Sequence, residues 1–159
     1  MANETREAMK LSNQLCFPLY AAARHVTGLY TPVLKPLGLT YTQYIVFLVL
    51  WERDGISVTE IGERLMLDNG TLSPMLKKLE QAGYIERRRC REDDRVVRIT
   101  LTDAGRALQE KAKDVPGRVA RCIDLPPEKA AALYTLLYEL LDHQNNKQIR
   151  EDISNENSL

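Results

Sequence analysis

The sequence predicts a mainly α-helical protein with a small β wing, built around a winged helix-turn-helix. Two observations predict this fold class. Between Ser57 and Thr102, two short helices with start and stop signals precede an arginine-rich hairpin. On both sides of that module, apolar residues recur at steps of three and four, which is typical of amphipathic helices. No run of about 18 apolar residues occurs, so the sequence predicts no membrane span.

The central module opens with a helix start signal. Ser57-Val58-Thr59-Glu60 is a capping box, in which a hydroxyl and a carboxylate satisfy two free backbone amides. A polar turn over residues 66–70 follows, and its glycine is expected to take a positive φ. The second helix is predicted from about residue 71 to residue 82, with Pro74 in its first turn and Gly83 as its left-handed stop.

Two short strands are predicted after this helix, around the acidic tip Glu92-Asp93-Asp94. From Glu86 to Arg91 there are four arginines and one glutamate, whereas the segment from Glu139 onward has five acidic and two basic residues. The formal net charge of zero therefore hides a basic wing and an acidic tail. Phosphate binding depends on the local field, which salt screens beyond roughly 10 Å at 0.1 M, so a neutral total does not exclude nucleic acid.

The flanking segments are predicted to be helical. One long helix, kinked or straight, is expected over about residues 8–31, and Thr40-Tyr41-Thr42-Gln43 caps a very apolar helix over residues 44–53. The latter could be a strand by propensity alone, but its cap favours a buried helix. After the wing, a helix is expected from about Ala104, interrupted or bent at Pro116-Gly117.

A last helix is predicted from about residue 127, with a ladder of leucines and a polar, fraying end after His143. The expected organisation is residues 1–39 as an N-terminal helix, 40–102 as the winged module and 103–159 as C-terminal helices. The module is too small to bury the flanking helices, so they are expected to pair in a homodimer. The alternative is a monomer whose end helices pack on its own core. The N-terminus has no apolar signal core, which favours a cytoplasmic protein.

One long signal consists of the stretch from Asp68 to Glu80, then Gly83, then Asp93-Asp94-Arg95. Through these residues the chain resembles the MarR family of transcriptional regulators, over almost its whole length. Four further segments carry a narrower signal: Asn13-Gln14-Leu15-Cys16-Phe17, Leu19-Tyr20-Ala21, Tyr30-Thr31-Pro32 and Leu39-Thr40-Tyr41-Thr42-Gln43-Tyr44. These segments resemble the OhrR branch, which senses organic hydroperoxides.

The OhrR resemblance implies that Cys16 is the peroxide sensor and that Tyr30 and Tyr41 hydrogen-bond to it. The chemistry fits, because a thiol attacks a hydroperoxide as the thiolate and phenol donors favour the charged sulfur. Without these neighbours, Cys16 would be read as a small buried hydrophobe. Pro18 departs from the family pattern. It either kinks the first helix or starts a new helical segment just after the cysteine, where the helix dipole would favour the thiolate.

The resemblance also implies a resolving cysteine, since some OhrR-like proteins carry one in the region of Cys122. A disulfide between Cys16 and the partner's Cys122 is expected, and an inert thiol is the alternative. Cys90 is interpreted as incidental. Three dispersed cysteines and two histidines show no CxxC or HxxxH spacing, so neither a metal site nor a cofactor is predicted.

The expected partner is double-stranded, palindromic operator DNA, read by the second helix and the wing. The resemblance places Arg95 at the wing tip that enters the minor groove. The residues expected to contact DNA are Asn69, Thr71, Ser73, Lys77, Arg87, Arg89, Arg91, Arg95 and Arg98.

The resulting prediction is a regulator, with repression favoured by the family, that releases its operator when Cys16 is oxidised. Two alternatives stay open. One is a MarR-type repressor released by a small phenolic ligand, with Cys16 as a bystander. The other is a thiol peroxidase, which would be an enzyme, but the sequence has neither a peroxidase motif nor a βαβ pattern.

Overall fold

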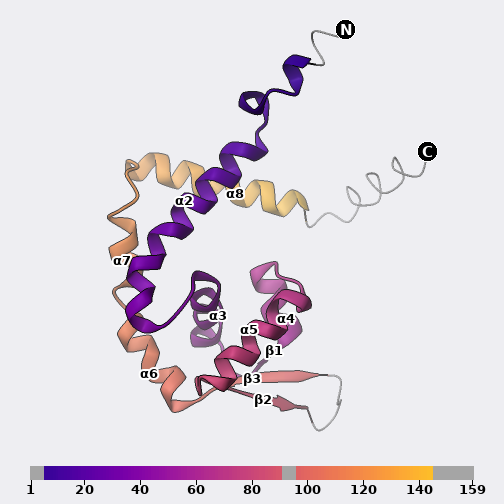
Figure 1. Cartoon of the computed structure of the whole chain (residues 1–159), viewed down its shortest axis with the longest axis vertical. Helices are drawn as coiled ribbons and strands as arrows, with labels where there is room; N and C mark the ends of the chain where they lie inside the picture. The colour runs from indigo at the N-terminus through magenta and orange to yellow at the C-terminus, as the bar shows by residue number, and fades with distance from the viewer. Residues whose placement is uncertain (1–5, 91–95, 145–159) are drawn as a thin grey trace, which may run out of the picture. The chain divides into compact units, whose positions relative to one another are not determined.

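Helices make up most of the regular structure, and a three-stranded sheet supplies the rest (Figure 1). The structure is a computed structural model that describes residues 6–90 and 96–144. The chain divides into two units, residues 1–122 and residues 123–159, and each is described by itself. The expected fold class, mainly helical with a small β wing, is confirmed.

The first unit contains most of these elements. In chain order they are η1 (Leu11–Asn13), α2 (Cys16–Leu34), η2 (Lys35–Leu37), α3 (Tyr41–Glu52), β1 (Ile56–Ser57), α4 (Val58–Leu65), α5 (Asn69–Gln81), β2 (Ile85–Arg89), β3 (Val97–Leu101), α6 (Asp103–Ala112) and α7 (Val115–Ala120). The second unit contains α8 (Pro127–Gln144), which begins where the proline pair predicts.

The first long helix starts at Cys16, so the prediction of one helix from about residue 8 is wrong over its first two turns. Pro18 is the reason. It has no N–H to donate and its ring would clash with the carbonyl of residue 14 in a continuous helix, so it favours a helix start here and occupies the first turn of α2. Of the two roles considered for Pro18, the start of a new helical segment is the one observed. At the other end, α2 continues through Pro32 to Leu34 instead of ending at residue 31.

Helix α3 is a helix and not a strand, as its cap predicts. Thr40 and Gln43 form a complete capping box, with the Gln43 N–H donating to Thr40 Oγ1 at 3.3 Å and the Thr40 N–H donating to Gln43 Oε1 at 2.9 Å. The helix supplies the centre of the core, since Val46, Phe47 and Leu50 are fully buried.

The helix-turn-helix is confirmed, with two corrections at its turn. The Ser57 hydroxyl caps α4 by accepting from the Glu60 N–H at 3.1 Å, but the Glu60 carboxylate pairs with Arg53 at 3.0 Å. The left-handed residue of the turn is Met66, at φ 53°, and Gly70 lies inside α5. Helix α5 therefore begins two residues earlier than predicted, with Asp68 as its cap.

The wing is an antiparallel hairpin, as predicted, and it belongs to a three-stranded sheet in the order β1-β3-β2. Strand β1 was not predicted, because two residues carry no visible alternation. Ile85, Ile99 and Leu101 are buried on the inner face of the sheet, against the helices. Residues 91–95, which include the acidic tip, lie outside the described residues.

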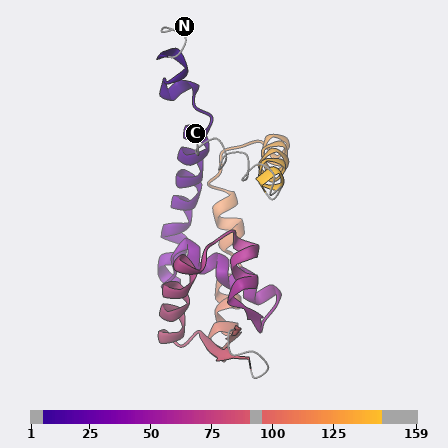
Figure 2. The same cartoon turned by 90° about the vertical axis from the view of Figure 1, so that its right-hand side faces the viewer.

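The helices after the wing follow their predicted caps. The Thr102 hydroxyl accepts from the Gly105 N–H at 3.1 Å to start α6, and the Pro116 region forms the separate short helix α7. Helix α7 packs against α2, and the two views in Figures 1 and 2 show them side by side.

In the described part of the chain, no single helix is long and apolar enough to span a membrane. The segment Cys16–Leu37 and the helix α3 reach the required length and hydropathy only when they are taken together, and they are bent by 75° relative to each other.

Candidate functional site

Cys16 occupies the first position of α2 and is exposed. Backbone N–H groups at a helix start have no intrahelical acceptor and favour a nearby negative charge. Large apolar side chains surround the thiol in sequence and are themselves exposed: Leu15 at 71%, Phe17 at 43% and Tyr20 at 59%. The cysteine thus lies among apolar side chains that are exposed within the described residues.

Three tyrosines form a cluster at the other end of α2. The rings of Tyr30 and Tyr41 are 4.8 Å apart, and the rings of Tyr30 and Tyr44 are 5.9 Å apart, measured between ring centroids. Burial raises the pKa of Tyr41 and that of Tyr44, and the neighbouring Tyr30 raises both further. The phenols of Tyr41 and Tyr44 therefore stay protonated at neutral pH and remain hydrogen-bond donors. Tyr44 was missed from the sequence, although its spacing of three from Tyr41 places both on one side of α3.

Cys16 and the tyrosine cluster do not meet within one chain. Cys16 and Tyr30 are fourteen positions apart on the same helix, and a rise of 1.5 Å per residue separates them by about 21 Å. The structure brings together the two predicted tyrosines and leaves the predicted sensor, Cys16, at the other end of α2.

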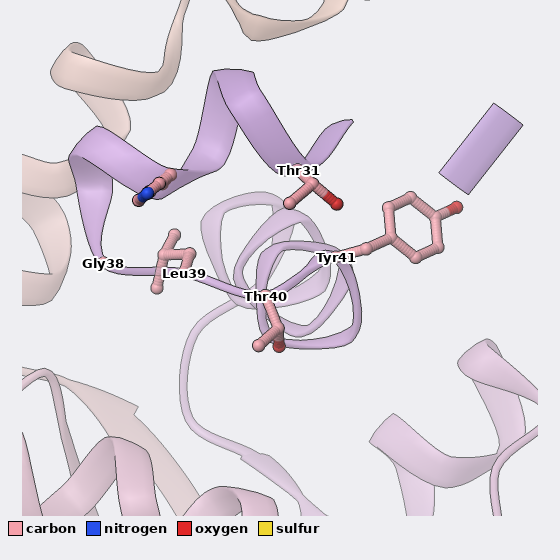
Figure 3. Close-up of a pocket in the computed structure, with 6 residues that line it drawn as sticks. Thr31, Gly38, Leu39, Thr40 and Tyr41 are labelled. Carbon is pink, nitrogen blue, oxygen red and sulfur yellow. The ribbon is translucent and has the colours of Figure 1, made fainter. Parts of the chain in front are cut away.

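A hollow of about 320 Å³ lies beside Tyr41. In Figure 3, Thr31 comes from α2, Gly38 and Leu39 from the turn that follows it, and Thr40 and Tyr41 from the start of α3. Gly38 is at φ 68°, a conformation that favours glycine, and this left-handed turn brings the start of α3 back toward the end of α2. Lys35 completes the lining and is its only charged residue.

The exposed face of α5 carries polar side chains at helical spacing. Asn69, Ser73 and Lys77 are exposed and recur at steps of four, while Leu72, Leu76 and Leu79 are buried on the opposite face. The Thr71 hydroxyl is already used, because it donates to the Asp68 carboxylate at 2.9 Å. Of the four α5 residues predicted to contact DNA, Thr71 belongs to the helix cap, and Asn69, Ser73 and Lys77 present their polar groups on the exposed face.

The wing arginines divide between the two faces of the sheet. Arg87 is half-buried, and its backbone N–H and guanidinium both approach the Glu80 carboxylate, at 3.3 Å and 4.0 Å. Arg98 donates to the Gly55 carbonyl at 3.0 Å. Both side chains thus have roles within the fold. Arg89 is exposed, whereas Arg91 and Arg95 lie outside the described residues.

Arg88 was not among the predicted residues. Strand pairing sets it directly opposite Arg98, so the outer face of the wing carries two guanidinium groups side by side. Arg88 also pairs with Glu86 on its own strand. The alternation of side chains along a strand was the signal that could have identified it, because it separates Arg88 from Arg87 and Arg89.

The remaining cysteines are separate from this cluster. Cys122 is exposed, at the end of the first unit, and its thiol approaches the Arg118 carbonyl at 3.4 Å. Cys90 is half-buried beside the wing tip. Within residues 6–90 and 96–144, no group of three or more histidine, cysteine or acidic side chains is arranged to hold a metal ion.

A second hollow, also of about 320 Å³, lies between α3 and the α6–α7 segment. Tyr44, Leu48 and Trp51 line its α3 side, and Gln109, Glu110, Ala112, Lys113 and Pro116 line the other. Glu110 and Lys113 form an ion pair with each other. A hydrogen bond links α3 to α6 close to this hollow, because Trp51 Nε1 donates to the Gly105 carbonyl at 3.0 Å.

Comparison with known proteins places these features among transcriptional regulators. Residues 28–112 match the family described as transcriptional regulator SarA/Rot. The organic hydroperoxide resistance transcriptional regulator of Bacillus subtilis (strain 168) is 49% identical over 140 residues, which cover 87% of this chain and 95% of that protein.

Solved structures of AbfR, a Staphylococcus epidermidis protein, are also similar. Reduced AbfR bound to DNA has a TM-score of 0.73 at 39% identity, covering 89% of this chain and 99% of that one. Disulfide-formed AbfR has a TM-score of 0.60 at 40% identity, again covering 89% and 99%.

Proposed function

The chain belongs to the MarR-type transcriptional regulators, in the branch that includes the organic hydroperoxide resistance regulators, and we propose that it is a homodimeric DNA-binding regulator that senses organic hydroperoxides through Cys16. The observation that carries the proposal is the exposed Cys16 at a helix start, in a chain whose Tyr30 and Tyr41 rings lie 4.8 Å apart at the other end of the same helix. In this proposal the protein is a cytoplasmic, stoichiometric sensor and not an enzyme.

Binding to operator DNA is supported by α5 and the wing. The polar face of α5 suits the major groove, with Asn69, Ser73 and Lys77 as contacts and Thr71 as part of the helix cap. The wing residues Arg88, Arg89 and Arg98 are suited to bind DNA phosphates. Arg91 and Arg95 remain predicted DNA contacts. The half-buried Arg87 is assigned mainly to holding the wing against α5.

Dimerisation is supported by the apolar side chains that each unit leaves exposed. In the first unit they include Leu11, Leu15, Phe17 and Tyr20, and in the second, on α8, they include Leu133, Tyr134, Leu136, Leu137, Tyr138 and Leu140. Exposed apolar surface on this scale is typical of an interface. A second copy of the chain also supplies the second reading helix that a palindromic operator requires.

A dimer also resolves the separation of about 21 Å between Cys16 and Tyr30. We propose that Cys16 of one protomer is hydrogen-bonded by the partner subunit's Tyr30 and the partner subunit's Tyr41. Antiparallel packing of two α2 helices would set the start of each beside the tyrosine end of the other. The raised pKa of Tyr41 supports this role, because a protonated phenol donates to a thiolate.

The proposed reaction is a two-electron oxidation of Cys16. The thiolate attacks the terminal hydroperoxide oxygen; the S–O bond forms, the O–O bond breaks, and the departing alkoxide takes up a proton to leave as an alcohol. The thiolate of the partner subunit's Cys122 then attacks the sulfenic sulfur; the S–S bond forms, the S–O bond breaks, and the departing hydroxide takes up a proton to leave as water. The new intersubunit bond changes the relative position of the two α5 helices, and the operator is released.

The test uses a palindromic duplex selected by the purified protein from a randomised pool. One equivalent of cumene hydroperoxide is expected to release the parent protein from this duplex, and Cys90→Ser should behave as the parent does. Cys16→Ser should stay bound, and Cys122→Ser should gain one oxygen without forming a dimeric disulfide, as intact mass spectrometry would detect. Release of Cys16→Ser by the hydroperoxide would overturn the proposal.

A second candidate function is favoured by the hollow between α3 and the α6–α7 segment. Its walls, Tyr44, Leu48 and Trp51, suit a small aromatic ligand, and such a ligand would release DNA without touching Cys16. Trp51 emission reports on this hollow directly. Operator release by a phenolic acid from Cys16→Ser and parent alike, with a matching change in Trp51 emission, would favour the ligand-released repressor.

A further inference from the structure

Glu80 places a negative charge on the face of α5 that the proposed function assigns to DNA reading. It follows Asn69, Ser73 and Lys77 at helical spacing, in steps of four, four and three residues, and its side chain is 41% exposed. DNA phosphates repel a carboxylate, so Glu80 would weaken binding if it acted by its charge alone. Its contacts within the chain indicate a different role.

The Glu80 carboxylate links the last turn of α5 to the wing. Strand β2 is an edge strand of the sheet, so one side of its backbone has no neighbouring strand. The Arg87 N–H on this strand donates to Glu80 Oε1 at 3.3 Å, and Arg87 Nη1 lies 4.0 Å from Glu80 Oε2. Arg87 Nε is buried without a hydrogen-bond partner among the described residues. The guanidinium is therefore incompletely satisfied, and the backbone hydrogen bond is the closer contact with Glu80.

The remaining connection between α5 and β2 is short. Residues 82–84 join the two elements; Gly83 turns the chain at φ 76°, and the Tyr84 N–H donates to the Leu79 carbonyl at 3.0 Å. Leu79 and Ile85 are buried, which fixes the base of the wing. Arg87 lies two residues beyond Ile85 along β2, so its hydrogen bond to Glu80 also restrains the direction in which the hairpin leaves α5.

We propose that Glu80 is a positioning residue for operator recognition, which holds the wing at the angle to α5 at which both contact one duplex together. This inference rests on the proposed function, in which α5 and the wing both bind DNA. A wing that is not held in place must be ordered when the operator binds, and that cost lowers affinity. Non-specific binding is mainly electrostatic and does not require this angle. Glu80 therefore acts on specificity.

The test separates the hydrogen-bond acceptor from the charge. Glu80→Gln and Glu80→Ala both remove the charge, but only glutamine keeps an oxygen that can accept from the Arg87 N–H. Fluorescence anisotropy at one salt concentration gives the dissociation constants for the operator duplex selected from the randomised pool and for a scrambled duplex of the same composition. Glu86→Ala is the matched control, because Glu86 is also exposed on β2 and pairs with Arg88 on its own strand.

Loss of a hydrogen bond to a charged group should raise the operator dissociation constant of Glu80→Ala by about ten-fold. Removal of one exposed negative charge should lower the dissociation constant for the scrambled duplex by about two-fold in all three variants. The ratio of the scrambled to the operator dissociation constant should thus fall about 20-fold in Glu80→Ala. In Glu80→Gln and Glu86→Ala this ratio should stay close to that of the parent protein.

The outcomes separate this inference from the proposed function. A ratio in Glu80→Ala equal to that of the parent would overturn the positioning role and leave DNA binding intact. An equal fall in Glu80→Gln or in Glu86→Ala would also overturn it, because loss of charge would then explain the effect. Glu80→Leu, which also lacks an acceptor and keeps high helix propensity, repeats the comparison if Glu80→Ala does not fold. If the parent protein selects no duplex from the pool, the proposed function fails and this inference fails with it.

Discussion

Gly105 shows how closely a single residue can be fixed by its surroundings. It lies in the first turn of α6, where its carbonyl accepts the Trp51 Nε1–H and its N–H donates to Thr102. A Cβ at this position would lie 2.2 Å from the Tyr84 carbonyl oxygen and 3.0 Å from a Leu101 methyl group. The nearest atom is backbone, which cannot rotate away.

Gly105→Ala is therefore expected to destabilise the protein. Forcing an extra methyl group into a packed contact costs about 1–3 kcal/mol, and the higher helix propensity of alanine offsets only up to about 1 kcal/mol of this. Urea unfolding at fixed protein concentration measures the change. Gly117→Ala is the matched control, because its Cβ would meet only the Arg121 guanidinium, at 3.8 Å. Equal stability of the two variants would contradict this account of the contact.

At the scale of elements, helix starts marked by a capping hydroxyl were predicted well. The starts of α2 and α5, which lie inside an apolar stripe or a turn-like segment, were not. Thr40, Ser57 and Thr102 cap α3, α4 and α6 as predicted, because a capping hydroxyl is a local signal. Helix α3 nevertheless begins at Tyr41, three residues before the predicted start at residue 44. The start of α2 at Cys16 was missed because the apolar stripe continues across Pro18. The early start of α5 was missed because Asn69-Gly70 is typical of a turn, while Asp68 outweighs it as a cap.

The sequence proposes the residues of the candidate site one by one, and it does not give their arrangement. The rings of Tyr30 and Tyr41 lie 4.8 Å apart, whereas Cys16 stands about 21 Å along the helix from Tyr30. The resemblance implies the pairing without stating which protomer supplies the tyrosines. In the wing, a run of arginines predicts a basic surface. Alternation along β2 sets Arg87 and Arg88 on opposite faces, and only the register of β2 against β3 shows that Arg88 lies opposite Arg98.

The cap of α5 makes a prediction about pH. Hydrogen bonds from the Thr71 N–H, at 2.8 Å, and from the Thr71 hydroxyl lower the pKa of Asp68, because they favour the ionised carboxylate. A carboxyl whose pKa is lowered in the folded state stabilises the fold above its ordinary pKa, and this stabilisation is lost as the pH falls through the lowered pKa.

Asp68→Ala should accordingly lower the melting temperature at pH 7, and the difference from the parent should shrink as the pH falls from about 5 to about 2. Asp68→Asn should keep most of the stability at pH 7, because asparagine also caps a helix, and its stability should lack this contribution to the pH dependence. Thermal unfolding followed by circular dichroism measures all three proteins. A difference between Asp68→Ala and the parent that does not vary with pH would show that the ionised carboxylate is not what stabilises α5.

The molecule as a whole is arranged to act in pairs. Each chain holds one reading helix, one candidate sensor thiol and one tyrosine cluster, and that thiol, Cys16, lies too far from the tyrosines of its own chain to use them. We therefore expect the exposed apolar side chains of α2 and α8 to form the dimer interface that also assembles the sensor site. If this is correct, disrupting the dimer disables DNA binding and peroxide sensing together.

Helix α8 offers the cleanest test of that coupling. Leu136 and Leu140 are 61% and 41% exposed in the single chain and lie one turn apart. Burial of a leucine contributes about 1.5–3 kcal/mol, so Leu136→Glu combined with Leu140→Glu should raise the dimer dissociation constant by at least about 100-fold. Sedimentation equilibrium measures this change, and operator affinity and the rate of Cys16 oxidation should fall with it. Thr135→Glu, placed on the polar side of α8 with Glu128 and Glu139, should leave all three unchanged. A double variant that stays dimeric would exclude this face of α8 from the interface, whereas a monomer that still oxidises Cys16 rapidly would refute the shared site.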